Sequence, residues 1–427
     1  MRGLYTALLC LALPCMLLRL LWRSLKTPAY RGRWKERLGL FEPPGGADTL
    51  WIHAVSVGEV QAALPLVRLL QQRHPDQPIV ITTTTPTGSQ RVKELFGAEL
   101  FHVYAPYDLP WIVERFLDRA RPRLMVLMET EIWPNMLAIC RRRGIPSLLA
   151  NARLSGRSAR GYARLGAFTR QTFETIGLIA AQAPADAERF AALGAPPDRI
   201  EVTGSIKFDI RLPRILNEQA EAVRRAWGHD RPVWVAASTH EGEDEQVLDA
   251  HARIRRQLPA CLLVLVPRHP ERFDRVAALC LKRGFNLVRR SSQADCGPET
   301  SVFLGDSMGE LPVFLAGADV AFVGGSLVQH GGHNMLEPAA LGVPVVFGPH
   351  NFNFAAISEL LLQEHAAVRV ENAGELAAVV EGWLEDASER SRVGENGRRV
   401  VEQNRGALEK LAGLIDRMLA ANDGYLE

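Results

Sequence analysis

Residues 323–350 read VGGSLVQHGGHNMLEPAALGVPVVFGPH, and this stretch decides the fold that we expect. An apolar run, residues 319–323, leads into two glycine pairs and then into a helix that Asn334 is expected to open as its N-cap. The free N–H groups at such a helix end attract anions, typically phosphate, and glycine lets the backbone approach a ligand closely. A second apolar run follows at residues 343–347. The stretch therefore predicts a parallel α/β fold with a phosphate-binding loop, and a tight turn without a ligand is the alternative.

Length and composition limit the possible classes of protein. A chain of 427 residues is long enough for two or three domains with their own cores. The net charge of +2 gives no reason to expect nucleic acid as a partner. The six cysteines form no C-x-x-C pair, so reduced thiols are the simplest account. No D-x-D triplet occurs, which argues against a diphosphate site bridged by a metal.

Two series of short apolar runs alternate with helical patterns, which predicts two parallel sheets with right-handed crossovers. The strands expected in the first series are residues 50–54, 79–83, 100–104, 124–128, 147–150, 178–182 and 200–203. Helical patterns occupy residues 60–74 and 111–120, and a break follows at residues 209–219. The strands expected in the second series are residues 233–237, 262–266, 302–304, 319–323, 343–347 and 367–370. Residues 385–419 form an amphipathic helical tail, and neither half contains the G-x-G-x-x-G pattern of dinucleotide-binding proteins.

The N-terminus combines an apolar run with a basic segment. Residues 7–18 are apolar, with a Pro14 that is expected to kink a helix, and no small-residue cleavage site of a signal peptide follows. The basic residues that come next are Arg23, Lys26, Arg31, Arg33, Lys35 and Arg37. Positive charge beside an apolar helix favours the cytoplasmic face and anionic headgroups. We predict a membrane anchor for a cytoplasmic enzyme, and the alternative is a buried helix of a soluble protein.

Three charged residues after the strands of the first series are candidates for catalysis. Glu59 follows the first strand, where it is placed for a general base or, alternatively, only complements a helix N-terminus. Glu129 continues directly from an apolar run, so its charge is costly unless it is paired. Lys207 is expected to end the last strand and to be the partner of Glu129, and a purely structural salt bridge is the alternative.

Three loops of the second series are candidates for binding one nucleotide. Arg268, beside Pro267, offers a fork of donors suited to phosphate or a base edge. Residues 308–310 offer backbone groups to a nucleobase, and residues 334–337 offer a helix end and the Glu337 carboxylate for ribose hydroxyls. In the first series Arg153 and Arg157 are placed to bind an acidic acceptor, although a solvated loop is equally compatible with them.

In chain order, the motifs VSVGE, TTTTPTG, YDLP, METEIWPN, NARLSGRS, TGSIKFD, STHEGE, VPRHPERF, GDSMGELP and VGGSLVQHGGHNMLEP resemble those of the 3-deoxy-D-manno-octulosonic acid (Kdo) transferases of lipopolysaccharide biosynthesis. The resemblance covers nearly the whole chain. It implies a B-type glycosyltransferase fold, in which two Rossmann-like lobes face a cleft. It also implies an inverting enzyme of Gram-negative bacteria that moves Kdo from CMP-Kdo to the lipid A precursor at the cytoplasmic side of the inner membrane.

Residue by residue, the resemblance implies that Glu59 is the proton acceptor and that Glu129 and Lys207 stabilise the transition state. The implied CMP contacts are Pro267, Arg268, Met308, Gly309, Glu310, Asn334, Met335, Leu336 and Glu337. CMP carries a single phosphate, so fixed cations suffice, and we expect neither a metal nor another cofactor. The expected parts of the chain are an anchor at 1–24, an acceptor lobe at 25–211, a donor lobe at 212–405 and a helix at 406–427 that packs back across the lobes.

Two other functional classes fit parts of the pattern. A nucleotide-sugar 2-epimerase shares the two-lobed fold but needs no membrane anchor. A membrane-tethered protein that only binds a nucleotide sugar needs no base, so Glu59, Glu129 and Lys207 discriminate against it. Membrane lipids are the further partner that we expect, and no motif indicates a protein partner.

Overall fold

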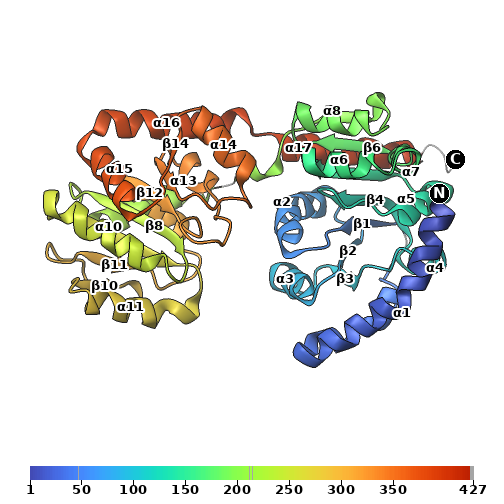
Figure 1. Ribbon diagram of the computed structural model, residues 1–427, viewed down its shortest axis with the longest axis horizontal. Helices are drawn as coiled ribbons and strands as arrows, with labels where there is room; N and C mark the ends of the chain where they lie inside the picture. Colours follow the sequence, from blue (N-terminus) through green and yellow to red (C-terminus); the bar gives the residue numbers. More distant parts are fainter. Residues whose placement is uncertain (47, 211, 214, 424–427) are drawn as a thin grey trace. The chain divides into compact units, whose positions relative to one another are not determined.

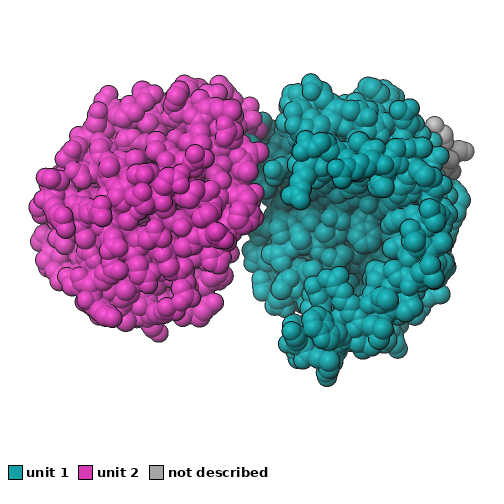
Figure 2. Space-filling model, in the orientation of Figure 1, with its two compact units in different colours: residues 1–209, 405–427 teal, residues 210–404 magenta. Residues whose placement is uncertain are grey.

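The computed structural model describes residues 1–46, 48–210, 212–213 and 215–423. The chain divides into two compact units, coloured separately in Figure 2. Unit 1 consists of Met1–Asp209 together with Arg405–Glu427, and unit 2 consists of Ile210–Asn404. The boundary that we predicted at residue 211 and the last four residues of the predicted helix 406–427 lie outside the described residues.

Unit 1 is built on a seven-stranded parallel sheet with the order β3-β2-β1-β4-β5-β6-β7. Its strands are β1 (Thr49–His53), β2 (Ile79–Thr83), β3 (Phe101–Tyr104), β4 (Pro122–Met128), β5 (Ser147–Ala152), β6 (Leu178–Ala181) and β7 (Ile200–Val202). The strand order reverses between β1 and β4. In sheets of this kind ligands bind beyond the carboxyl ends of the strands that flank the reversal.

Helices cover both faces of this sheet, which explains why its strands are continuous apolar runs. The helices are α2 (Val57–Arg73), α3 (Pro86–Phe96), α4 (Pro110–Ala120), α5 (Pro134–Arg142), α6 (Gly156–Ala163), α7 (Ala167–Phe173), α8 (Pro184–Ala192) and α17 (Ala407–Asp423). Leu50 and Ile52 of β1 face one core, which includes α2 and α17, and Trp51 faces the other core. In Figure 1 the red α17 accordingly lies beside the sheet of unit 1.

Unit 2 repeats this plan with the strand order β10-β11-β9-β8-β12-β13-β14, again all parallel. Its strands are β8 (Val233–Thr239), β9 (Leu262–Pro267), β10 (Leu287–Arg289), β11 (Val302–Leu304), β12 (Val320–Val323), β13 (Val345–Phe347) and β14 (Ala367–Arg369). Its helices are α9 (Leu216–Trp227), α10 (Asp244–Gln257), α11 (Phe273–Lys282), α12 (Leu311–Ala316), α13 (Leu336–Ala340), α14 (Ala355–Gln363), α15 (Ala373–Glu385) and α16 (Ala387–Gln403). The reversal in this sheet lies between β8 and β12.

The N-terminal helix α1 (Arg2–Lys26) lies along one side of unit 1, drawn in dark blue in Figure 1. By length and composition it can cross a membrane, with a mean hydropathy of 2.0 over its most apolar window. Ser24 is its only buried residue, so the alternative of a buried core helix is wrong. The Tyr5 hydroxyl donates to Asp108 Oδ2 (2.9 Å), which attaches the start of the helix to the loop before α4.

The exposed apolar side chains of α1 follow helical spacing along one side, and they are Leu4, Leu8, Leu11, Leu18, Leu21, Trp22 and Leu25. The helix continues through Pro14 without ending there. A helix that is half-buried on one face and exposes an apolar stripe on the other can place that stripe in lipid.

Most predicted strands match the observed ones to within two residues, and the differences concern short elements. The strand β10 (Leu287–Arg289) was not predicted, and it is an edge strand of three residues. The helical tail that we predicted at residues 385–419 is confirmed as helical, and it consists of α16 and α17, separated by a break in which Gly406 adopts a φ of +96°. Part of the predicted break at 209–219 is helical, because α9 begins at Leu216, while residues 211 and 214 of that break lie outside the described residues.

Candidate active site

Glu59 lies in the first turn of α2, directly after β1 at the strand reversal of unit 1. Ser56 is the N-cap of this helix, and its Oγ accepts a hydrogen bond from Glu59 N (3.3 Å). The Glu59 carboxylate in turn accepts from Val55 N and from Ser56 Oγ, each at 2.8 Å. This reciprocal pattern resembles a capping box. Glu59 is therefore a carboxylate at a helix N-terminus, as the alternative interpretation of the sequence had it. The hydrogen bonds of this arrangement fix the position of the candidate base.

The environment of Glu59 holds its carboxyl group close to the point where the charged and neutral forms are equally populated at neutral pH. Burial raises the pKa of Glu59 to about 7, the nearby charges of Glu131 and Glu129 add to the rise, and the hydrogen bonds from Ser56 and Val55 oppose it. A general base works best when its pKa lies near the operating pH. Glu59 thus combines a fixed geometry with a pKa suited to accepting a proton.

Glu129 follows β4, the strand on the other side of the reversal, and it is half-buried. Its φ of +57° lies in the left-handed region, and its N–H donates to Ala150 O (2.9 Å). On the neighbouring strand Asn151 has a φ of +52°. Such strained residues persist only where the surroundings hold them, and they cluster at functional sites.

We predicted that Lys207 ends the last strand of the first series. This prediction is wrong, because β7 ends at Val202. Lys207 lies instead in a single 3-10 turn, Ile206–Phe208, which packs against α2. Ile206 N donates to Asn151 Oδ1 (3.2 Å), and the Asp209 carboxylate accepts from Gly406 N and Leu408 N, each at 2.7 Å. The turn that carries Lys207 is therefore held at both ends.

Polar atoms that are buried without a hydrogen-bond partner also occur beside this turn. Among the described residues, Asn151 Nδ2 and Ser205 Oγ are buried and have no such partner. An unpaired buried donor costs free energy, and in native proteins it calls for an explanation such as a ligand. Both atoms are thus available to a polar substrate group.

In unit 2 the three loops proposed for the nucleotide all follow the carboxyl ends of strands. Pro267 ends β9, and the exposed Arg268 donates through its backbone N–H to Thr239 O (3.0 Å). Residues 308–310 connect β11 to α12, with an exposed Met308 and a φ of +88° at Gly309. The Glu310 carboxylate is paired with Arg290 (2.8 Å). The groups that this loop presents to a ligand are therefore mainly those of its backbone.

The helix that we expected Asn334 to open begins later and is short. Leu336–Ala340 is helical, and Met335 is its N-cap. Asn334 still serves the helix end, because its Oδ1 accepts from Leu336 N (3.1 Å) and its Nδ2 donates to Glu337 Oε1 (3.0 Å). Glu337 is the second residue of the helix, and burial raises the pKa of its carboxyl group.

The glycine pairs within residues 323–350 pack against protein atoms. A Cβ on Gly324 would lie 2.7 Å from Glu243 Oε2, and one on Gly331 would lie 2.5 Å from Asn353 Nδ2. The fully buried carboxylate of Glu243 accepts hydrogen bonds from Gly325 N (2.7 Å), Ser326 N (3.1 Å) and Leu327 N (2.9 Å). Successive N–H groups of this kind make an anion site. Here the anion is a side chain of the protein itself.

Several residues that the sequence motifs did not single out are brought to these edges by the fold. Glu131 adds a third carboxylate near Glu59, and burial raises its pKa while Trp133 Nε1 donates to it (2.8 Å). In unit 2 four histidines meet, and they are His240, His269, His330 and His333. Each of these residues lies inside a motif quoted above and follows a predicted strand. Its position after a strand was the sequence signal that could have marked it as a candidate site residue.

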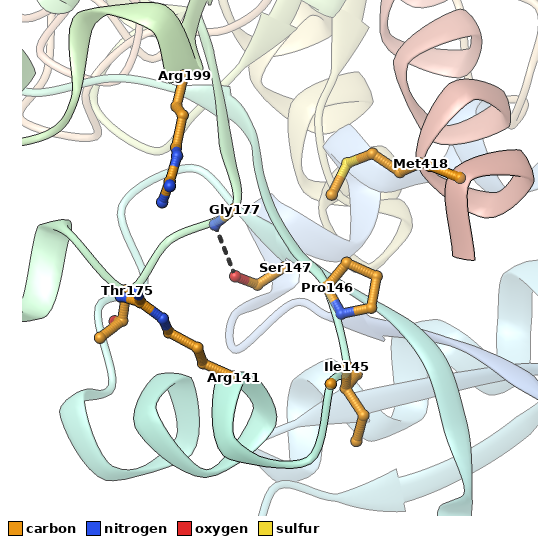
Figure 3. Close-up of a pocket in the computed structure, with 10 residues that line it drawn as sticks. Arg141, Ile145, Pro146, Ser147, Thr175, Gly177, Arg199 and Met418 are labelled. Atoms are coloured by element: carbon orange, nitrogen blue, oxygen red, sulfur yellow. Dashed lines mark hydrogen bonds between the residues drawn. The ribbon is translucent and has the colours of Figure 1, made fainter. Parts of the chain in front are cut away.

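A separate open pocket of about 550 Å³ occupies the opposite edge of the unit 1 sheet (Figure 3). Ser147 begins β5, and its Oγ accepts from Gly177 N (3.1 Å), which precedes β6. Arg141 and Arg199 also line this pocket. Because it lies at the amino ends of the strands, it is remote from the catalytic candidates of the same sheet.

Comparisons with known proteins assign a family to each half of the chain. Residues 32–210 match the family described as 3-Deoxy-D-manno-octulosonic-acid transferase (kdotransferase), and residues 235–400 match that of Glycosyl transferases group 1. A protein of Haemophilus influenzae named 3-deoxy-D-manno-octulosonic acid transferase is 45% identical over 99% of each chain. A Bordetella pertussis protein of the same name is 37% identical over 98% of this chain and 99% of the other.

Solved structures that resemble the chain over most of its length have much lower identities. The UDP-GlcNAc 2-epimerase of Neisseria meningitidis has a TM-score of 0.55 and 14% identity, covering 88% of this chain and 100% of that one. The glycotransferase of kitacinnamycin has a TM-score of 0.51 and 16% identity, with coverage of 88% and 100%. These likenesses show the shared fold alone. The full-length relatives decide the family: the chain belongs to the 3-deoxy-D-manno-octulosonic acid transferases, which are glycosyltransferases.

Proposed function

We propose that this Kdo transferase moves Kdo from CMP-Kdo to the lipid A precursor, a phosphorylated and acylated glucosamine disaccharide, and releases CMP. The acceptor hydroxyl attacks the anomeric carbon while the bond from that carbon to the phosphate oxygen breaks. The electron pair of the broken bond leaves with the phosphate, and attack from the opposite face inverts the configuration. Unit 1 supplies the base, and unit 2 supplies the nucleotide site.

The observation that carries this proposal is the state of Glu59 at the strand reversal of unit 1. Its carboxylate is fixed by hydrogen bonds at the helix N-terminus and has a pKa of about 7, so near neutral pH it can accept the proton of the acceptor hydroxyl. General base catalysis of this kind typically contributes about 10²–10⁴-fold in rate. A protein that only binds nucleotide sugars has no use for such a group.

Electrostatic stabilisation is the second part of the mechanism. Negative charge develops on the phosphate of the departing CMP, and positive charge develops on the sugar ring. We assign Lys207 to the phosphate and Glu129 to the sugar, because preorganised charges are often the largest single contribution to catalysis. One phosphate carries less charge than two, so this set of fixed charges acts without a metal ion.

The nucleotide is assigned to the three loops of unit 2. Arg268 and Pro267 face the base or phosphate, backbone groups of Met308, Gly309 and Glu310 face the base, and the Glu337 carboxylate accepts from the ribose hydroxyls. Residues 334 and 335 supply backbone N–H groups. The strands β11, β9, β8 and β12 are successive neighbours in the sheet, so the three loops leave from one edge.

The acceptor and the membrane are assigned to unit 1. The exposed apolar stripe of α1 enters the inner membrane from the cytoplasmic side, next to the exposed basic residues Arg23, Lys26, Arg31 and Lys35. Arg33 and Arg37 have structural roles instead, because Arg33 binds Glu36 (2.6 Å) and the buried Arg37 donates to Thr84 O (2.9 Å). The acidic acceptor is assigned to Arg153 and to the exposed Arg157 at the start of α6.

Incubation of the full-length protein with CMP-Kdo and the acylated acceptor tests the proposal. We expect release of CMP that depends on the acceptor, together with an acceptor that has gained the mass of Kdo. Release of CMP without a glycosylated product would contradict the transfer reaction. An acceptor without phosphate groups, used in parallel, reports on the roles of Arg153 and Arg157.

A further inference from the structure

Four imidazole rings meet at the carboxyl edge of the unit 2 sheet. His240 follows β8, His269 follows β9, and His330 and His333 lie in the loop after β12. The ring of His240 stacks on that of His330 with centroids 4.1 Å apart, and the edge of His269 meets it at 5.4 Å. The ring of His333 lies nearly parallel to that of His240, with centroids 5.0 Å apart. The cluster extends from the buried His240 to the exposed His330, so a ligand can reach it from solvent.

The two central rings share a hydrogen bond. His240 Nε2 and His333 Nε2 lie 2.7 Å apart, so one nitrogen donates and the other accepts. This arrangement requires one proton between the two atoms and is therefore impossible when both rings are fully protonated. Burial, followed by the neighbouring cationic groups, lowers the pKa of His240 to about 3 and that of His333 to about 4. The pair is thus neutral at physiological pH in the free protein.

The backbone around the pair is built to hold it. Gly325 has a φ of +67°, and a Cβ there would lie 3.0 Å from His333 Cδ2 and 3.3 Å from His240 Cδ2. The carboxylate of Glu243 accepts from His240 N (3.1 Å) as well as from Gly325 N (2.7 Å), which ties the loop after β8 to the loop after β12. These two strands flank the reversal of the unit 2 sheet, where ligands of such folds bind.

The charged groups around the pair favour an anion. Arg268 and His269 act on His333 from the loop after β9, and Arg272 acts on His240 from the turn that follows. Three acidic groups near this edge are occupied, since Glu243 is bound by backbone N–H groups, Asp244 is paired with Arg272, and Glu241 is paired with Arg275 (2.6 Å). The exposed Glu271 lies 4.0 Å from His269 Nδ1, on the outer side chain of the cluster. Within the described residues, no group of three or more His, Cys, Asp or Glu side chains is arranged to hold a metal ion.

We propose that His240 and His333 form the site that receives the phosphate group of the nucleotide, sharing one proton in the free protein and taking up a second from the solvent when phosphate binds. The phosphate gains a charged donor, and its negative charge offsets the burial and the nearby positive charges that keep the rings neutral in the free protein. This inference rests on the proposed CMP-Kdo donor, and it adds two binding residues between the loops at 267–268 and 334–337.

Calorimetry with CMP and cytidine tests the site on the full-length protein. His333→Asn should weaken CMP binding by about 10-fold to 100-fold, the usual range for a hydrogen bond to a charged group, and leave cytidine binding unchanged. The matched control is His229→Asn, which alters a histidine of unit 2 whose side chain is 80% exposed. Equal losses for CMP and cytidine, or no loss, would overturn the assignment, as would a loss seen only with CMP-Kdo, which points to the sugar carboxylate.

Proton uptake separates this role from a merely structural one. At pH 7.5 the phosphate of CMP is already mostly a dianion, because its second pKa is about 6. Calorimetry in two buffers of different ionisation enthalpy should therefore show uptake of up to one proton with CMP and none with cytidine. His333→Gln keeps a polar group but cannot take up the proton, so it should abolish the uptake while retaining part of the affinity. Uptake that persists in this variant would refute the proposal.

Two further outcomes are informative. Wild-type protein that is folded and binds neither CMP nor cytidine would refute the proposed donor, and titration with inorganic phosphate against His333→Asn would then decide the histidine pair by itself. Stoichiometric zinc binding that is lost in His333→Asn would show that the cluster is a metal site and would overturn the phosphate assignment.

Discussion

Glu59 combines two roles that make opposite demands on its charge. As the carboxylate at a helix N-terminus it accepts hydrogen bonds from Val55 N and Ser56 Oγ, which favour the ionised form. As a buried group near Glu129 and Glu131 it favours the neutral form, and burial dominates, since the pKa rises to about 7. The same compromise suits the proposed base, since the carboxyl group can take a proton near neutral pH and can also remain buried.

Replacing Glu59 by Gln should abolish transfer while preserving the fold. Glutamine is accepted at this position of a capping box, so α2 should keep its N-terminus. Loss of the base should lower kcat by about 10²-fold or more, with CMP affinity nearly unchanged because the nucleotide is assigned to unit 2. Steady-state kinetics and calorimetry measure the two effects. Activity within a few-fold of the parent would remove Glu59 from the mechanism.

The same substitution should stabilise the protein at alkaline pH. The folded pKa of Glu59 lies above the ordinary value of 4.5, so the folded state binds the proton more tightly than the unfolded state does. The stability that comes with this proton is present below about pH 4.5 and is lost as the pH rises through about 7. At about 1.36 kcal/mol per pKa unit the loss approaches about 3 kcal/mol. Thermal unfolding of Glu59→Gln and of the parent should therefore coincide near about pH 4, diverge progressively above about pH 4.5 and differ most above about pH 7.

Transfer should continue in excess EDTA after dialysis. The reason is the assignment of developing phosphate charge to Lys207 and, in unit 2, to Arg268 and the histidine pair. The measurement is CMP release with and without the chelator. A collapse of activity that Mg²⁺ restores would show that these fixed groups are insufficient.

At the scale of secondary-structure elements, four of the residues that we expect to contact the nucleotide, 334–337, lie at the start of the short helix α13. Asn334 and Glu337 are hydrogen-bonded to each other (3.0 Å), so the orientation of the carboxylate depends on the amide. Glu337→Ala removes both the carboxylate and the partner of Asn334. Glu337→Gln keeps an oxygen for Asn334, and it is the matched control for the structure of the loop.

Glu337→Ala should weaken CMP binding by about 1.5–3 kcal/mol, the range for hydrogen bonds to a charged group. Deoxy-CMP should bind the parent less tightly than CMP does, but it should lose little further affinity in the mutant. Calorimetry of both nucleotides with both proteins forms a double cycle. Additive losses would mean that Glu337 does not touch the ribose.

The strands were predictable because parallel strands covered by helices are continuous apolar runs bounded by turn residues. Positions of Glu59, Glu129 and the nucleotide loops followed from the rule that such sheets bind ligands at their carboxyl edge. The partners of Gly324 and Gly325 were not predictable, since Glu243 comes from a different strand connection. The histidine cluster was missed for the same reason: its rings come from three loops and form no local pattern. The helix start at Leu336 was misplaced because a helix of five residues leaves little periodicity.

At the scale of the whole molecule, attachment to the membrane and the integrity of unit 1 meet at α1. Deletion of residues 1–22 removes the apolar stripe except Leu25, and also the Tyr5 hydroxyl that donates to Asp108. Asp108 accepts from Asn135 N and Met136 N at the start of α5, so unit 1 should keep its fold but lose some stability.

The truncated protein should leave the membrane in high salt. Residual binding through Arg23, Lys26, Arg31 and Lys35 should amount to about 1 kcal/mol per residue near anionic lipid, and salt should screen it. Flotation with anionic vesicles at low and high ionic strength measures this, and Tyr5→Phe serves as the control that removes the Tyr5–Asp108 hydrogen bond and keeps the apolar stripe. Binding of the truncated protein that survives high salt would place the anchor elsewhere.

The return of α17 to unit 1 has a consequence for synthesis on the ribosome. Ala407, Leu408 and Leu411 complete a core whose other walls are formed by β1 and α2, whereas unit 2 is drawn from one continuous segment between them. During translation unit 2 can therefore finish folding while unit 1, although its strands emerge first, still waits for its last helix. The unit that carries the proposed base is completed last, so a nascent chain holds its proposed nucleotide site before it can have a finished proposed acceptor site.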